Sequence, residues 1–337
     1  MKRTQYKYLM IPVCLSILTF GGCSPEAPSR EGFDKAAEVG QTVTTDSLMP
    51  AIRRLAQVRL SDTPVDCEGF EPGELFPACD LTRDASVKFV AESFQSLGYD
   101  ADTVALMKEG QLTAYNVVAE WPGVTKPQEV VLLGSHLDAY YAGADDNGSA
   151  VAVMLETARA VRNFQFARTI RFISFDLEEY GSVGSTRYVE AGYANDIVAG
   201  IVMDLIGYAS SEDGSQKQLP GIKLPDKGDF LLVAGNGNSM EMTQQMTALC
   251  NTYNLTKAFG LIVPGDGAYF FSSAFMRSDH GLLWFRGIPV LFITDTANFR
   301  NPNYHKLSDT PETLDSVFLA QNARAVAATI ALMAEVQ

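Results

Sequence analysis

Two of the three histidines in this chain lie in segments that also carry carboxylates. His136 follows directly on an apolar run, residues 130–133, and Asp138, Asp145 and Asp146 come soon after it. A short hydrophobic strand that ends in histidine and aspartate is how an open α/β sheet presents ligands to a metal ion. On this segment alone, Asp145 and Asp146 are equally eligible as metal ligands.

Further candidate ligands lie at three other places. The adjacent Glu178 and Glu179 follow an apolar run, Asp204 ends another, and His305 stands in a loop before the last predicted helix. Adjacent glutamates that leave a strand cannot point the same way, so one can bind a metal while its neighbour faces the attacking water. Each residue alone is ambiguous, because an aspartate after a strand usually serves a turn. Together, two histidines, two aspartates and a glutamate are the ligand types and number for two zinc ions that share a carboxylate.

The composition bounds the class of protein. The chain has 337 residues, of which 47% are hydrophobic, enough to bury a substantial core in one large α/β domain. Its formal net charge of −14 argues against nucleic acid or an anionic membrane surface as a partner, because both demand clustered lysine and arginine.

The N-terminal residues are typical of an export signal. Basic residues precede an apolar stretch, 9–20, that is too short to span a bilayer comfortably. The residues before Cys23 resemble a bacterial lipoprotein cleavage site, which implies lipidation of Cys23, and Ser24 resembles the Gram-negative pattern for outer-membrane sorting. We therefore expect a signal peptide over 1–22 and an exported protein, periplasmic or anchored in the outer membrane by its lipid. Ordinary signal cleavage, which would release the protein, is the alternative.

Two further features follow from this context. Residues 23–45 are rich in proline, glutamate, serine and threonine, so we expect a lipid anchor and flexible tether there and a single catalytic domain over 46–337. Cys67 and Cys79 bracket a segment rich in proline and glycine, a spacing that suits a loop disulfide in an exported protein, with two free thiols as the alternative.

Apolar strands and helical patterns alternate through the rest of the chain. The predicted strands are 116–120, 130–133, 169–175, 200–203, 230–234 and 290–293. Helical spacing appears around 48–58, 87–98, 148–162, 239–254 and 315–334. This alternation predicts a largely parallel sheet covered on both faces, with the site at the carboxyl ends of the strands.

Motifs between about residues 116 and 315 resemble, in order, those of the co-catalytic di-zinc aminopeptidases, metallopeptidase family 28, which includes secreted bacterial leucine aminopeptidases. The motifs are SHLD at 135–138, GADDNGS at 143–149, EEYGSVGS at 178–185, MDLIG at 203–207, RSDH at 277–280 and DTANFRNPNYH at 295–305. The resemblance implies an α/β fold, a three-layer α/β/α sandwich with a mainly parallel, mixed central sheet.

Position by position, the resemblance also implies the metal ligands. His136 and Asp204 would hold one zinc ion, and Glu179 and His305 the other. Asp146 would bridge the two ions, because the family's pattern is Gly-Ala-x-Asp, and a cis peptide bond would follow it. The implied cofactor is therefore two zinc ions per chain.

Other roles follow from the same resemblance. Glu178 would be the general base, taking a proton from the metal-bridging water and passing it to the leaving amine. Tyr304 is a candidate hydrogen-bond donor to the oxyanion, as a tyrosine is in some relatives, with simple packing as the alternative. We expect Asp138 to orient the imidazole of His136, and Asp309 to give similar support, with a turn or cap as the alternative for Asp309.

The resulting interpretation is an exported zinc aminopeptidase that removes N-terminal residues from peptides with a free N-terminus. A glutaminyl-peptide cyclase of the related single-zinc branch is the alternative, although those cyclases carry a tryptophan before the last histidine, where this chain has Tyr304. A non-catalytic binding lipoprotein is a third hypothesis. Such a protein should have lost a ligand or the base, and none is missing here. The preferred N-terminal residue stays open.

Overall fold

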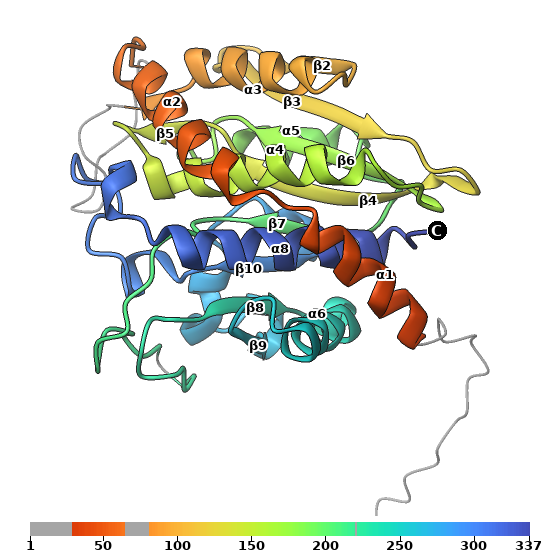
Figure 1. Cartoon of the computed structure of the whole chain (residues 1–337). Helices are drawn as coiled ribbons and strands as arrows, with labels where there is room; N and C mark the ends of the chain where they lie inside the picture. Colours follow the sequence, from red (N-terminus) through yellow and green to blue (C-terminus); the bar gives the residue numbers. More distant parts are fainter. Residues whose placement is uncertain (1–28, 65–80, 220) are drawn as a thin grey trace, which may run out of the picture.

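A computed structural model describes most of the chain (Figure 1). The described residues are 29–64, 81–219 and 221–337. The predicted signal peptide, the lipidation at Cys23 and the disulfide between Cys67 and Cys79 lie outside these ranges.

The core of the fold is an eight-stranded mixed sheet with the order β2-β3-β6-β4-β7-β10-β8-β9. Its central strands β6, β4, β7 and β10 run parallel, whereas β3 and β8 run antiparallel to their neighbours β6 and β10. The strands are β2 (Ala101–Leu106), β3 (Ala114–Trp121), β4 (Lys126–His136), β6 (Arg168–Phe175), β7 (Ile197–Met203), β8 (Leu231–Gly235), β9 (Ala258–Ile262) and β10 (Leu291–Thr294). A separate short pair joins β1 (Leu81–Thr82) to β5 (Ala139–Tyr140).

Helices cover both faces of the sheet, as the three-layer prediction requires. Alternate residues of each strand face opposite layers, so Val131 and Leu133 pack in one apolar cluster and Val130 and Leu132 in the other. One face carries α1 (Arg30–Gln41), α2 (Leu48–Leu60), α3 (Asp84–Ser96), α4 (Ala150–Val161), α6 (Met240–Tyr253) and α8 (Ser316–Met333). The other carries α5 (Val183–Glu190) and α7 (His280–Phe285).

The prediction of a flexible tether up to residue 45 is wrong for its described part. Residues 30–41 form α1, which packs against α8 and buries Ala36 and Val39. A Cβ atom on Gly40 would lie 2.7 Å from the carbonyl oxygen of Arg324 in α8, so the two helices are in close contact there. The polar composition conceals this helix, because small apolar residues at helical spacing are enough to pack it. The domain therefore begins by residue 30, not 46.

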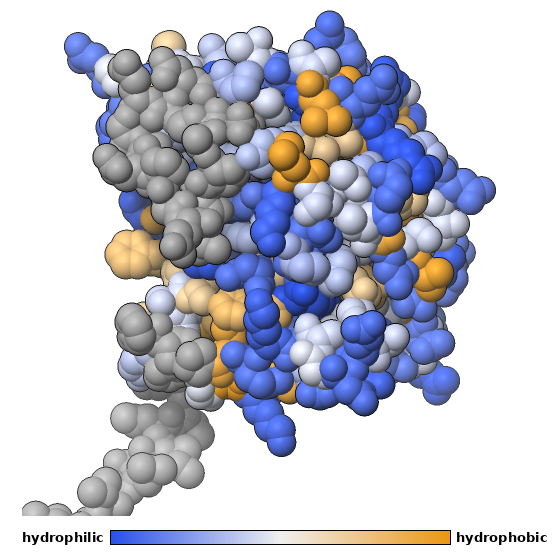
Figure 2. Space-filling model, turned by 90° about the vertical axis from the view of Figure 1, so that its left-hand side faces the viewer, coloured by the Kyte–Doolittle hydropathy of each residue, from blue (hydrophilic) through white to orange (hydrophobic). Residues whose placement is uncertain are grey.

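The parallel strands end at one edge of the sheet, on the left of Figure 1. Figure 2 looks onto this edge, where hydrophilic side chains predominate and hydrophobic ones form small separate groups. In an open α/β sheet this is where loops from neighbouring strands bring polar side chains together.

Candidate active site

The predicted ligands all come from loops or strand ends at this edge. His136 is the last residue of β4, and Asp204 follows β7 directly. Glu179 lies in the turn after β6, Asp146 in the loop between β4 and α4, and His305 in the loop between β10 and α8. Four stretches of the chain, which follow β4, β6, β7 and β10, therefore meet at one place.

Within the site, Asp146 faces both histidines. Its Oδ1 lies 3.3 Å from Nε2 of His136, which is also 3.3 Å from Oδ1 of Asp204. Its Oδ2 lies 3.0 Å from Nε2 of His305, which is also 3.0 Å from Oε2 of Glu179. All five side chains are buried. The result is two three-residue groups that share one carboxylate.

The distances and donor atoms fit zinc. Ligand atoms about 2.0–2.1 Å from a tetrahedral zinc ion lie roughly 3.3 Å from one another. The distances of 3.0–3.3 Å from each imidazole nitrogen to its two carboxylate oxygens match that spacing. Oε1 of Glu179 is buried and accepts no hydrogen bond from the described residues, which leaves a lone pair open to a cation.

The charges of the site also favour a cation. Although burial lowers the pKa of both imidazoles, the neighbouring carboxylates raise the pKa of His136 well above its usual value and that of His305 to about 11. Without a metal, protons on the two imidazoles partly neutralise the carboxylates. A metal ion would replace those protons, so metal binding should release them.

Asp145 takes no part in either group among the described residues. Its Oδ1 accepts the backbone N–H of Gly207 at 2.9 Å, and its Oδ2 accepts the side-chain amide of Asn301 at 2.7 Å. The carboxylate therefore joins loops behind the site, and the structure places Asp146 alone between the histidines. The peptide bond from Asp146 to Asn147 is cis, as the resemblance implied.

Glu178 lies beside the His136 group. Its Oε2 is 4.0 Å from Nε2 of His136, and its Oε1 accepts a hydrogen bond from Oγ of Ser182 at 3.3 Å. Burial, with the nearby charges of Asp204 and Glu179, raises the pKa of Glu178 well above its usual value. A carboxylate with a raised pKa holds a transferred proton more readily than an exposed one.

Asp138 supports the site in a different way from the one predicted. The imidazole Nδ1 of His136 lies 3.0 Å from the main-chain carbonyl oxygen of Asp138 and 3.7 Å from its carboxylate. The carboxylate instead accepts the backbone N–H groups of Glu178 at 3.1 Å and Glu179 at 3.0 Å. The carbonyl therefore orients the histidine, and the carboxylate fixes the turn that carries both glutamates.

Asp309 supports the bridging aspartate. Its carboxylate accepts the backbone N–H groups of Asp145 at 2.9 Å and Asp146 at 3.1 Å. We expected Asp309 to orient a histidine, but it holds the backbone of the loop between β4 and α4.

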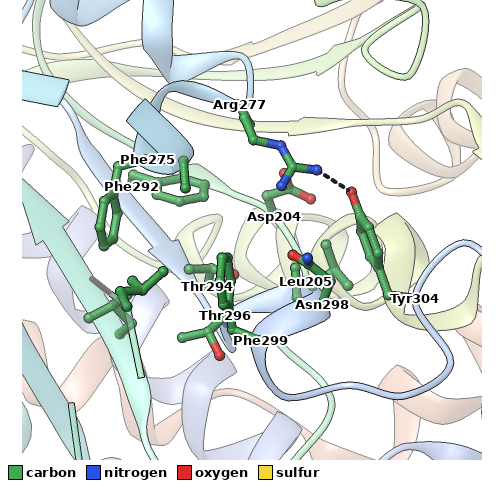
Figure 3. A pocket seen from close by; sticks show the side chains of 14 residues that line it. Asp204, Leu205, Phe275, Arg277, Phe292, Thr294, Thr296, Asn298, Phe299 and Tyr304 are labelled. Carbon is green, nitrogen blue, oxygen red and sulfur yellow. Dashed lines mark hydrogen bonds between the residues drawn. The ribbon is translucent and has the colours of Figure 1, made fainter. Parts of the chain in front are cut away.

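Tyr304 stacks on the His305 ring, with ring centroids 3.7 Å apart. Its hydroxyl accepts a hydrogen bond from Arg277 at 3.3 Å (Figure 3). Burial raises the pKa of Tyr304 well above its usual value, so the phenol keeps its proton at neutral pH. Because Arg277 occupies an acceptor site of the oxygen, that proton is available for another acceptor.

An apolar pocket of about 60 Å³ opens beside Asp204, as Figure 3 shows. Its walls come from β8, β10, the short helix Phe270–Met276 and the loop after β10. The apolar side chains in its lining include Leu219, Leu232, Phe275, Phe292 and Phe299. Such a lining suits an apolar group of a ligand whose polar end lies at Asp204.

One supporting residue escaped the sequence prediction. Arg59, in the last turn of α2, is buried and donates hydrogen bonds to the loop that joins His136 to Asp146. A single arginine at the end of an amphipathic helix matches no motif, and the loop it contacts lies more than 70 residues further along the chain. Only the three-dimensional structure brings them together.

Comparisons with known proteins identify a family and relatives for this chain. Residues 116–330 match the sequence profile of Peptidase family M28. YfbL of Escherichia coli K12 is 30% identical over 223 residues, 61% of this chain and 67% of that protein. Leupeptin-inactivating enzyme 1 of Streptomyces exfoliatus is 29% identical over 273 residues, which cover 73% of this chain but only 54% of the enzyme. The chain thus spans between about half and two thirds of the length of these two relatives.

Solved structures show the same fold at low identity. The Legionella pneumophila LapA aminopeptidase superposes with a TM-score of 0.66 at 16% identity, over 91% of this chain and 76% of that one. A Porphyromonas gingivalis glutaminyl cyclase superposes with a TM-score of 0.56 at 17% identity, over 85% and 97%. The fold is therefore shared by aminopeptidase and cyclase, whereas the sequence match is decisive for the family: this chain belongs to peptidase family M28.

Proposed function

We propose that this protein is a zinc-dependent aminopeptidase that binds two metal ions and removes N-terminal residues from peptides. The observation that carries the proposal is the position of Asp146, which offers one carboxylate oxygen to each histidine. Two complete three-residue groups that share a carboxylate suit a pair of ions, and both groups are buried.

Five residues would hold the metals. His136 and Asp204 would bind one ion, Glu179 and His305 the other, and Asp146 both. When bound, zinc supplies Lewis-acid chemistry, because it lowers the pKa of water and polarises a carbonyl group.

Glu178 would move the proton. Its carboxylate lies beside the His136 group, and its raised pKa suits a group that takes a proton from water and then gives it to the leaving amine. Two hydrogen bonds fix the carboxylate of Glu178 in place. Ser182 donates one to the carboxylate itself, and the backbone N–H of Glu178 donates the other to Asp138. Tyr304 would donate its phenolic proton to the oxygen of the scissile carbonyl as negative charge develops there.

The site also suits a substrate with a free N-terminus. The carboxylates of Glu178 and Asp204 would attract the α-ammonium group. The apolar pocket beside Asp204 would then receive the first side chain of the peptide, which favours residues such as leucine, methionine or phenylalanine.

Export remains a proposal that rests on the N-terminal sequence. The basic and apolar residues before Cys23 support a lipoprotein signal and a periplasmic or outer-membrane location. Metabolic labelling with a fatty acid tests it: the wild-type protein should be labelled in a bacterial host, and Cys23→Ser should not.

A panel of substrates tests the function. Leucyl, alanyl, lysyl and glutamyl nitroanilides should be compared with a glutaminyl peptide, each with and without a chelator. We expect fastest hydrolysis of the leucyl substrate, loss of activity with the chelator and recovery with added zinc. Cyclisation of the glutaminyl peptide without hydrolysis of any nitroanilide would instead establish the cyclase. No turnover of any substrate by the zinc-loaded protein would favour a binding role.

A further inference from the structure

Arg59 is charged, yet only 1% of its surface is exposed. Arginine is almost never buried to this extent unless it is paired. Among the described residues, however, no carboxylate lies within ion-pair distance of its guanidinium. The side chain instead donates hydrogen bonds to uncharged oxygens, most of them in the main chain.

These hydrogen bonds tie together one loop. Nη2 donates to the carbonyl oxygen of Leu137 at 2.7 Å, and Nη1 donates to that of Gly143 at 2.7 Å and that of Ala142 at 3.3 Å. Leu137 directly follows His136, and Gly143 comes three residues before Asp146. The guanidinium therefore links the two ends of the segment that joins a predicted ligand to the predicted bridge.

The loop is shaped to receive the guanidinium. Gly143 has a φ of +51°, and a Cβ atom there would lie 3.0 Å from Nη1 of Arg59 and would collide with the carbonyl oxygen of Asp146. A Cβ atom on Gly148 would lie 2.8 Å from the carbonyl oxygen of Gly143 and 3.4 Å from Nη1. On the other side, Nε donates to Oγ of Ser86 in α3 at 3.0 Å, which fixes the plane of the guanidinium.

The charge of Arg59 also faces the acidic site. Burial lowers the pKa of Arg59 to about 10, and four carboxylates oppose that effect. The guanidinium therefore stays protonated at neutral pH. The four carboxylates belong to Asp138, Asp146, Asp309 and Glu179.

We propose that Arg59 is a positioning residue that sets the affinity of the site for zinc, by holding His136 and Asp146 at the separation that two ligands of one ion require. This inference rests on the metal site of the proposed function. Partners that orient metal ligands typically change affinity by about 10- to 100-fold when they are removed. A lysine would keep the charge, but it lacks the planar fork that reaches Leu137 and Gly143 together.

Zinc titration against a chromogenic chelator tests the proposal on the whole folded protein. Arg59→Met, which replaces the apolar stem of the side chain and has no donor, should bind zinc about 10- to 100-fold more weakly than wild type. Arg59→Lys should lose less. Arg187→Met is the matched control, because Arg187 is also buried and donates to the carbonyl oxygens of Leu106 and Leu112, away from the ligands. It should lower the melting temperature and leave zinc affinity unchanged.

The outcomes separate the two proposals. If wild type itself binds no zinc, the proposed function fails. If wild type binds zinc and Arg59→Met binds it equally well, or Arg187→Met weakens binding to the same extent, Arg59 has no positioning role. If Arg59→Met does not fold, the zinc affinity of Arg59→Lys decides. An affinity equal to that of wild type would contradict the inference. A weaker affinity, with the zinc affinity of Arg187→Met unchanged from wild type, would support it.

Discussion

The carboxylate of Asp309 accepts the backbone N–H of Asp146 at 3.1 Å. Through this bond the loop before α8 holds the aspartate that faces both histidines. The site thus depends on loops after different strands that position one another, and this dependence can be tested away from the ligands themselves.

Asp309→Asn should weaken the site. An amide has one acceptor oxygen, so one of the two buried N–H groups that Asp309 now binds would face another donor. We expect the free energy of unfolding in urea to fall by about 1–3 kcal/mol, and zinc retained after dialysis to decrease. Asp315→Asn is the control, because Oδ1 alone of Asp315 accepts both of its backbone partners. Full zinc retention in Asp309→Asn would contradict this account.

Ala274→Phe should change which substrates are accepted. Ala274 is half-buried and lines the apolar pocket beside Asp204, so a phenyl ring there would occupy the space for the substrate's first side chain. We expect kcat/KM for a leucyl substrate to fall about 10-fold or more relative to an alanyl substrate. Circular dichroism should show an unchanged fold. An unchanged ratio of leucyl to alanyl activity would mean that the side chain binds elsewhere.

Tyr304→Phe should lower kcat by roughly 100-fold with little change in KM or zinc content. The phenol keeps its proton at neutral pH and accepts a hydrogen bond from Arg277. The variant therefore removes the proton that Tyr304 would donate to the substrate. Steady-state kinetics with metal analysis separate the possibilities. A wild-type kcat would show that Tyr304 only packs on His305.

His280 should make the fold sensitive to mild acid. It lies against Phe292, and its Nε2 is 2.5 Å from the carbonyl oxygen of Phe275. Burial lowers its pKa to about 3. Below about pH 6.5 the imidazole of His280 takes up a proton in the unfolded chain but not in the folded protein. The free energy of unfolding therefore decreases as the pH is lowered.

Urea unfolding of wild type and His280→Gln at pH 6.5 and 5.0 measures this effect. Wild type should lose about 1.5–2 kcal/mol more than the variant between these values. The buried carboxylates titrate in both proteins, so their contribution to the loss of stability cancels in the difference. Equal losses would mean that His280 accepts a proton in the folded state.

The sequence predicted the parts of the fold that are buried on both faces. The central strands β4, β7 and β10 contain continuous apolar runs because helices cover both sides of them, and His136 and Asp204 stand at or just past the ends of β4 and β7. The strands β2 and β9 were missed because they lie at the two ends of the sheet, where half-buried and exposed residues give no continuous apolar run.

What the sequence could not supply are contacts between distant segments. The choice of Asp146 over Asp145 came from the family's pattern, whereas the structure gives the physical reason, since Asn301 and Gly207 bind the carboxylate of Asp145. The roles of Asp138 and Arg59 depend on backbone groups of other loops, which leave no pattern in the chain.

Metal analysis and activity of Glu178→Gln test the central claim most directly. The amide keeps the size of the side chain but cannot take up the proton, so hydrolysis of a leucyl substrate should fall by about 10²- to 10⁴-fold. The variant and wild type should each contain two zinc ions per chain. One zinc ion per chain, or near-normal hydrolysis by Glu178→Gln, would contradict the account.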